Sequence, residues 1–149
     1  MQNSPPLFLL ILILAGVLGL GAVVAGFRLR PAAPSRGITL VAVLPGLAML
    51  GLFYSLAVHM HQSLGGWPTS IGEHGFPSPL VTHAGIATGF FTVLLLASVF
   101  AWPIALVVCA LVRRWRGGIF YLGVYALSCL VCFIAMLLAP SQFLYWWWD

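Results

Sequence analysis

Apolar and polar positions follow one another along this chain in long blocks rather than with the short period of an amphipathic helix or strand. Each apolar block is close to the roughly 20 helical residues that a membrane crossing requires. The blocks cover residues 7–27, 38–60, 88–112 and 119–139. The pattern therefore predicts an all-α integral membrane protein, a four-transmembrane-helix up-down bundle. Because arginines follow the first block rather than precede it, we interpret that block as a retained helix and not as a signal peptide.

Two of the blocks contain an internal proline, Pro45 in the second and Pro103 in the third. Proline lacks a backbone donor, and its ring collides with the carbonyl four residues earlier. We therefore expect a kink in both helices. The apolar sequence of the third block already begins upstream, at Leu80. The helical turns between Leu80 and the block carry His83, and we expect them to project from the membrane or to lie at its surface.

Small residues recur at four-residue spacing in the first and third predicted helices. These pairs are Ala15 and Gly19, Ala22 and Gly26, and Gly85 and Gly89. Helices pack closely in lipid where small residues face each other. The pairs predict contact ridges, either within the bundle or with another subunit. The alternative is that they reflect only the high glycine and alanine content of membrane helices.

The composition supports a membrane protein. The 149 residues are 62% hydrophobic and 5% charged, whereas soluble domains are about 25% charged. The net charge of +4 comes from arginines in two short clusters beside the apolar blocks, so a membrane explains them better than nucleic acid does. We expect one transmembrane domain, residues 1–149, whose partners are the lipid bilayer and other membrane subunits.

The arginine clusters also predict the orientation of the chain. They comprise Arg28, Arg30 and Arg36 in one loop and Arg113, Arg114 and Arg116 in another. Short loops rich in arginine stay on the cytoplasmic side of a membrane. We therefore expect both termini and the 61–79 loop to lie outside. The absence of lysine and of a eukaryotic targeting segment favours a bacterial inner membrane with a periplasmic outer side.

The 61–79 loop and its flanks gather the titratable side chains of the outer half of the protein. They hold all four histidines and one of the two acidic residues, namely His59, His61, His74, His83 and Glu73. Glycine and proline turns throughout the loop predict an ordered, outward-facing cap. Connectors of this length without secondary structure are commonly functional. We take these five residues as candidate metal ligands that converge at the outer interface.

Three chemistries suit such a site. Imidazole binds copper or zinc, His59 and His83 from different helices would hold a haem between them, and Glu73 with a histidine would form an acid–base pair or proton relay. His59 and His61 can share one ion only if the helix ends at or before His59, because residues two apart in a helix point about 200° apart. The alternative is that the histidines bond to backbone and water in a structured loop.

Within the predicted helices the chemistry is sparse. Cys129 and Cys132 have C-x-x-C spacing, but they fall near mid-span, without a helix N-terminus to lower a thiol pKa. We interpret them as small apolar side chains on one helix face. No charged residue lies mid-membrane, which argues against an ion channel or an ion-coupled transporter.

Two functions follow from these observations. The first is an accessory or structural subunit of a larger membrane complex, without catalytic residues of its own. The second is a metal- or haem-binding redox membrane protein that uses the outer-face histidine cluster. The identity of the cofactor, haem or copper/zinc, stays open at this stage.

Overall fold

The computed structural model describes residues 5–29, 34–68 and 75–149, and in these ranges the chain is helical without any strand. The helices are α1 (Pro5–Leu29), α2 (Arg36–Leu64), α3 (Ser78–Leu96), α4 (Trp102–Leu111), α5 (Gly118–Met136) and α6 (Ser141–Trp148). A π-helical segment, Ala97–Ala101, joins α3 to α4, and a short 3-10 helix, Arg113–Trp115, follows α4. The all-α class is confirmed.

Three helical segments in the described part are long and apolar enough to cross a membrane. They are Arg36–Leu64, Ser78–Leu111 and Gly118–Met136. The predicted count of four spans is not confirmed, because the further apolar stretch found among the described residues, Gly16–Gly26 within α1, is shorter than these three. The structure therefore supports a helical protein with three candidate spans.

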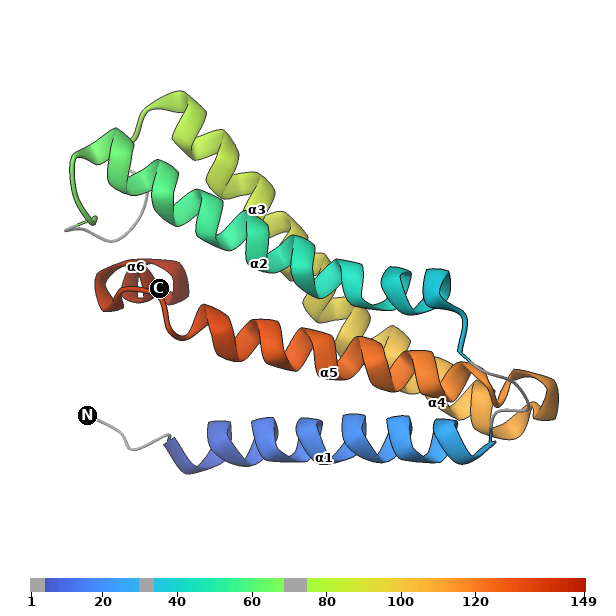
Figure 1. The fold of residues 1–149 in the computed structure, drawn as a ribbon. Helices are drawn as coiled ribbons and strands as arrows, with labels where there is room; N and C mark the ends of the chain where they lie inside the picture. The colour runs from blue at the N-terminus through green and yellow to red at the C-terminus, as the bar shows by residue number, and fades with distance from the viewer. Residues whose placement is uncertain (1–4, 30–33, 69–74) are drawn as a thin grey trace.

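Helix α5 is the centre of the arrangement. In Figure 1 it lies between α1 and α2, and it contacts α1, α2 and α4, while α2 also contacts α3. The turns at the end of α1 and between α4 and α5 lie at one end of the molecule (Figure 1). The turn after α2 and helix α6 lie at the opposite end. The described members of both arginine clusters therefore share one end of the molecule, and Arg30 falls outside the described residues.

Helices α1 and α5 approach each other through glycines. A Cβ atom placed on Gly123 would lie 2.5 Å from the backbone nitrogen of Val23, and one on Gly26 would collide with the backbone of Phe120. The ridge of Ala22 and Gly26 is thus a contact within the chain.

The second predicted ridge behaves differently. Cβ atoms placed on Gly85 and Gly89 would have nothing within 4 Å. Within its described residues, the chain leaves this part of α3 open.

Two helices extend further than their apolar blocks. Helix α2 continues past residue 60 to Leu64, and Gly65 caps its C-terminus with a left-handed φ of 67°. Glycine ends helices in this way because it adopts the left-handed conformation without strain. Helix α3 begins at Ser78 rather than at about residue 88, since Pro79 suits the first turn of a helix. The predicted 61–79 loop is shorter than expected as a result.

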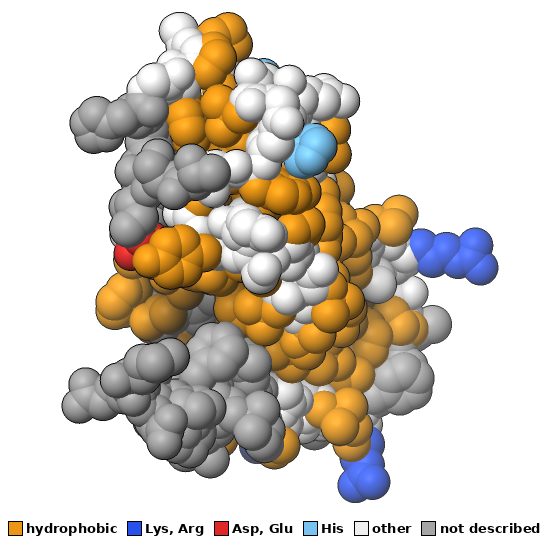
Figure 2. All heavy atoms as spheres, turned by 90° about the vertical axis from the view of Figure 1, so that its left-hand side faces the viewer, with side chains coloured by type: hydrophobic (Ala, Val, Ile, Leu, Met, Phe, Trp, Pro, Cys, Tyr) orange, Lys and Arg blue, Asp and Glu red, His pale blue; other side chains and the backbone are white. Residues whose placement is uncertain are grey.

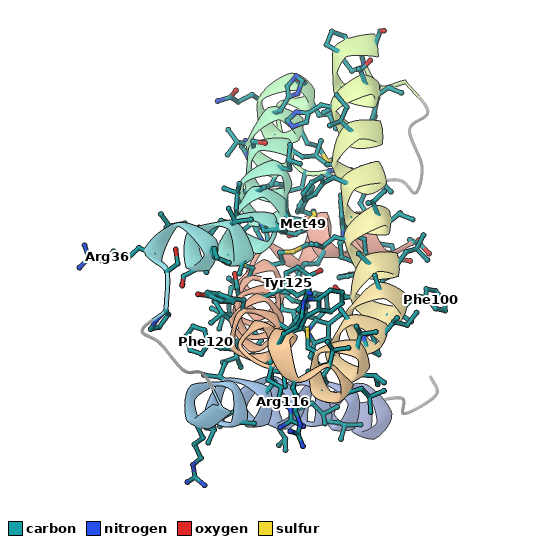
Figure 3. The ribbon with its side chains drawn as sticks, turned by 90° about the vertical axis from the view of Figure 1, so that its right-hand side faces the viewer. Arg36, Met49, Phe100, Arg116, Phe120 and Tyr125 are labelled. Atoms are coloured by element: carbon teal, nitrogen blue, oxygen red, sulfur yellow. The ribbon has the colours of Figure 1, made fainter. Side chains whose placement is uncertain are left out.

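The two internal prolines have different effects. At Pro45 the first turns of α2, which carry Arg36, run at an angle to the turns after Met49 (Figure 3). Pro103 instead follows the π-helical segment, whose wider turn accommodates the clash of the proline ring with the carbonyl of Val99. The expected kink in the third span is therefore a π-helical turn in one continuous helix.

The largest buried cluster lies at the end of the molecule that carries α6. Its fully buried large side chains are Phe53, Leu56, Met60, Leu80, Met136 and Phe143. The Phe143 ring of α6 lies 5.0 Å from that of Phe53 in α2, between ring centroids. Figure 2 looks onto this end, where apolar side chains cover much of the described surface. Helix α6 thus covers the core at this end of the molecule.

Candidate functional site

The structure brings His59 and His83 into direct contact. His59 lies near the end of α2 and His83 near the start of α3, so the turn between these helices places them opposite each other. Their Nδ1 atoms are 3.0 Å apart, and their ring centroids are 5.2 Å apart at an interplanar angle of 34°. Both side chains are partly buried. The two residues proposed as a cofactor-binding pair are therefore neighbours, and cofactor binding itself stays a prediction.

Ser55 determines a consistent set of tautomers for the pair. Its hydroxyl donates to the carbonyl of Leu52 at 3.0 Å, so its oxygen accepts from His83 Nε2 at 3.2 Å. A neutral His83 then has an unprotonated Nδ1, which accepts a hydrogen bond from His59 Nδ1. The Nε2 of His59 is left with a free lone pair. Each neutral imidazole in the pair thus has one defined donor and one defined acceptor.

The Nδ1 atoms are near the spacing that two ligands of one zinc or copper ion require. Two nitrogens bound to one tetrahedral ion through bonds of about 2.0–2.1 Å lie about 3.3 Å apart. The observed Nδ1–Nδ1 distance is 3.0 Å, so the rings would have to part slightly and turn until both lone pairs point at the ion. His59 would also move its proton to Nε2. These two imidazoles would supply two ligands, and the ion's remaining positions would be filled from elsewhere.

The same geometry does not fit a haem between the two histidines. Axial nitrogens on opposite sides of one iron lie about 4 Å apart, with the macrocycle between them. Rings in direct Nδ1–Nδ1 contact at 3.0 Å would have to separate before that plane could enter between these atoms. Haem binding at this position therefore stays a prediction.

The remaining candidate ligands do not join the pair in the described structure. His61 lies on α2, which continues beyond it, so it points away from His59 and packs against Trp67 at 4.7 Å between ring centroids. The condition that the helix end at or before His59 is not met. Glu73 and His74 fall outside the described residues. Among the residues that the structure describes, no group of three potential metal ligands forms.

Polar side chains in the candidate spans bond from helix to helix. The Tyr54 hydroxyl donates to the carbonyl of Ala135 at 2.7 Å. The Ser128 hydroxyl donates to the carbonyl of Val43 at 3.1 Å, so α2 and α5 are joined twice. The Trp102 indole nitrogen donates to the carbonyl of Leu122 at 2.9 Å, which joins α4 to α5. Hydroxyls that look isolated in sequence therefore hold the helices together.

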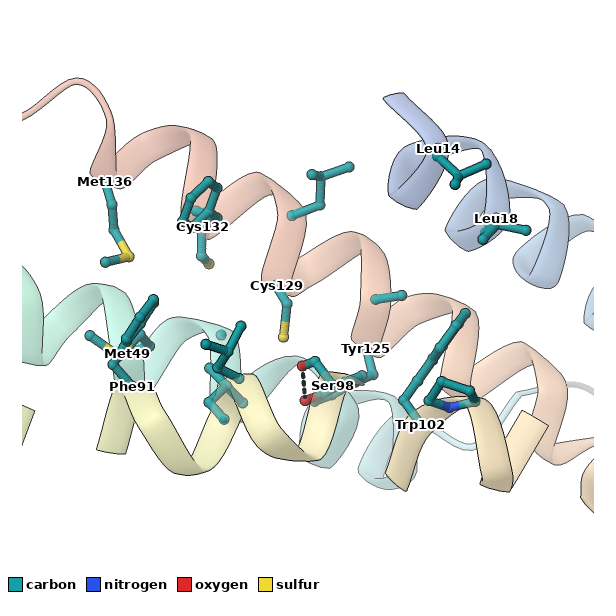
Figure 4. A pocket seen from close by; sticks show the side chains of 17 residues that line it. Leu14, Leu18, Met49, Phe91, Ser98, Trp102, Tyr125, Cys129, Cys132 and Met136 are labelled. Atoms are coloured by element: carbon teal, nitrogen blue, oxygen red, sulfur yellow. Dashed lines mark hydrogen bonds between the residues drawn. The ribbon is translucent and has the colours of Figure 1, made fainter. Parts of the chain in front are cut away.

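A cavity of about 410 Å³ lies between α5 and the α3–α4 helix, with α1 and α2 completing its walls (Figure 4). Its lining is mainly apolar. The hydroxyls of Ser98 and Tyr125 hydrogen-bond to each other at 2.9 Å inside it. Cys129 and Cys132 line it as well, from the same helix as Tyr125. The sequence analysis missed this cavity, and the one signal for it was that both cysteines share a helix face.

Comparisons of the chain with protein-family models, curated proteins and solved structures found no match. The function is therefore argued from the geometry alone.

Proposed function

We propose that this chain is an accessory or structural subunit of a larger membrane complex. The observation that carries the proposal is the packing of the helix Ser78–Leu111. Its most apolar stretch has 0% of its residues buried, against 28% for the corresponding stretches of α2 and α5. The first turns of this helix supply Leu80, Ala84 and Ala87 to the core, but its most apolar stretch buries no residue within the chain, and the surface of that stretch is free for other helices.

The exposed surface of this helix has the features of a helix-packing face. Phe100 points away from the bundle in Figure 3, and Val93 and Ile104 are similarly exposed. Gly85 and Gly89, one helical turn apart, have open space where a side chain would be. Such glycine pairs allow a second helix to approach closely in lipid. We propose a transmembrane helix of another subunit as the occupant of this face.

The polar chemistry of the spans supports a structural role. The hydroxyls of Tyr54 and Ser128 and the indole of Trp102 bond to carbonyls of neighbouring helices. Their interactions rigidify the bundle instead of forming a polar pathway across it.

Co-purification from native membranes tests the accessory role. A tagged chain carrying Gly85→Leu and Gly89→Leu should lose specific membrane partners, because the new side chains keep another helix away. The matched control is Gly51→Leu, at a helical glycine of α2 that also has nothing within 4 Å. The readout is quantitative mass spectrometry of each eluate. Equal partner recovery from both variants, or a wild-type chain that purifies without any partner, would contradict the proposal.

A second candidate function is copper or zinc binding at His59 and His83, and the 3.0 Å contact of their Nδ1 atoms favours it. We expect His59→Ala and His83→Ala each to weaken binding of added Cu²⁺ or Zn²⁺ by more than about tenfold. His61→Ala is the control, since His61 packs against Trp67 on a different face. The measurement is metal titration of the purified chain. The same affinity in all three variants would remove this candidate.

The proposed location is a bacterial inner membrane, with the arginine-bearing end in the cytoplasm. Arg28, Arg36 and the cluster 113–116 lie at one end of the fold (Figure 1), as the positive-inside rule requires of a single cytoplasmic face. The α6 end and the His59–His83 pair would then lie on the periplasmic side.

A further inference from the structure

We propose that the cavity between α5 and the α3–α4 helix binds a neutral, lipid-soluble molecule with a flat ring that carries a carbonyl or hydroxyl group. Its volume of about 410 Å³ falls within the roughly 300–1,000 Å³ of known ligand pockets. Among the described residues that line it, none is charged. A charged ligand would therefore have no partner here, whereas a neutral one would bury apolar surface.

The polar part of the ligand is recognised by two hydroxyl groups. The Tyr125 hydroxyl bonds to the Ser98 hydroxyl at 2.9 Å, and both residues line the cavity beside Cys129. Two hydroxyls joined by one hydrogen bond leave one O–H hydrogen for a further acceptor. In apolar surroundings that hydrogen favours a partner strongly. A single carbonyl or hydroxyl oxygen on the ligand meets this requirement.

The walls of the cavity suit a flat, polarisable ring. The aromatic side chains of Trp102, Phe91 and Phe133 line it together with the thioethers of Met49 and Met136. Aromatic faces and edges stack on rings, and sulfur atoms pack favourably against ring edges. A saturated acyl chain would use neither of these properties.

Access to the cavity is from the side. Leu14 and Leu18 of α1 and Leu95 of α3 line it and are 57%, 49% and 50% exposed. These side chains lie along the length of the helices rather than at their ends, so the opening faces the region that a bilayer occupies. A ligand would enter from the lipid phase.

The π-helical segment Ala97–Ala101 is an independent feature of the same place. It carries Ser98, which its wide turn presents to Tyr125 of α5. Single π-helical turns inside α-helices are frequent at functional sites. The irregular backbone and the polar cluster thus coincide at one wall of the cavity.

The test uses the full chain in phospholipid nanodiscs, titrated separately with decylubiquinone and with decylubiquinol. Both probes have a flat ring with oxygen, and comparison of their saturation identifies the preferred polar group as a carbonyl or a hydroxyl. Bound ligand is counted by native mass spectrometry. Tyr125→Phe and Ser98→Ala should each weaken binding by about fivefold to tenfold, the effect of one neutral hydrogen bond. Tyr121→Phe should leave it unchanged, because that hydroxyl bonds to the Ser35 backbone nitrogen.

A second readout, protection of a cysteine by bound ligand, can be recorded on the wild-type chain. A neutral maleimide should modify Cys129 more slowly when the cavity is filled, while the rate at Cys109, which does not line the cavity, stays the same. Leu95→Trp should block access and abolish this protection. The proposal is overturned if neither probe saturates, if phospholipid alone occupies the cavity, or if Tyr125→Phe, Ser98→Ala and Leu95→Trp bind like the wild type.

Discussion

Gly123 and Gly26 lie where α1 and α5 come closest, and a side chain at either position would meet the backbone of the opposite helix. Gly51 of α2 has the same helical conformation but open space around it. Glycine costs helix stability at both kinds of position. Close packing offsets that cost only at the α1–α5 seam, the contact between the two helices at Gly26 and Gly123.

Whether a glycine-to-alanine substitution raises or lowers the free energy of unfolding should therefore depend on the position of the glycine. We expect Gly123→Ala to lower the free energy of unfolding by about 1–3 kcal/mol, because a methyl group there overpacks the seam. Gly51→Ala should leave it unchanged or raise it by up to about 1 kcal/mol through its better helix propensity. Reversible denaturation in detergent measures both. A Gly123→Ala chain as stable as the Gly51→Ala chain would contradict the close approach.

Single residues were predictable from the sequence to different degrees. His59 and His83 were expected to oppose each other because they flank one turn between two antiparallel helices, and the structure places them together. His61 was expected to share an ion with His59 only if the helix ended at or before His59, and α2 instead continues to Leu64. The cavity role of Cys129 could not be predicted, since it depends on which helix packs opposite α5.

At the scale of helices, α6 shows how a short amphipathic segment contributes to the fold. Phe143 is fully buried against α2, while Tyr145, two residues later, is 67% exposed. Residues two apart on a helix point in opposite directions. One face of α6 therefore completes the core, and the other faces the surroundings.

Truncation of these two side chains should have unequal effects. Phe143→Ala removes a buried ring and leaves a cavity, so it should lower the free energy of unfolding by about 3–5 kcal/mol. Tyr145→Ala on the same helix should change it by less than about 0.5 kcal/mol. Thermal unfolding of the detergent-solubilised chains compares them. Equal losses would show that α6 does not cover the core as described.

Helix boundaries were less predictable than the existence of the helices. Hydropathy follows the apolar residues, whereas the backbone sets the boundaries of the helices: Gly65 follows the last turn of α2, and Pro77 precedes the first turn of α3. Helix α6 was missed because eight residues give too short a pattern. The π-helical turn before Pro103 was expected only as a kink, since the proline rule predicts a clash and not how the backbone relieves it.

For the molecule as a whole, the length of the apolar blocks predicted the helical class correctly, because about 20 apolar residues in a row suit a membrane-crossing helix. The predicted number of spans is not confirmed, since three candidate spans were found among the described residues. The pairing of the helices was not predictable. It depends on matched surfaces such as the α1–α5 glycines, which lie about 100 residues apart in the sequence.

Orientation in the membrane is the prediction that belongs to this scale. Alkaline phosphatase fused after Asp149 should be active in bacterial cells, because the C-terminus is proposed to be periplasmic and the enzyme requires export. A fusion after Arg116, in the arginine-bearing turn, should be inactive. Green fluorescent protein at the same two positions should give the reverse pattern. Phosphatase activity only at Arg116 would invert the proposed topology.

The seam between α1 and α5 also bears on how the chain is made. At a synthesis rate of about 5–20 residues per second, the ribosome needs roughly 5–20 s to progress from Gly26 to Gly123. During that interval α1 has been synthesised, but the face of α5 around Gly123 that packs against it has not. A nascent chain that stalls before α5 would present the groove-forming glycines of α1 without their counterpart, as a signal that proteolytic quality control can recognise.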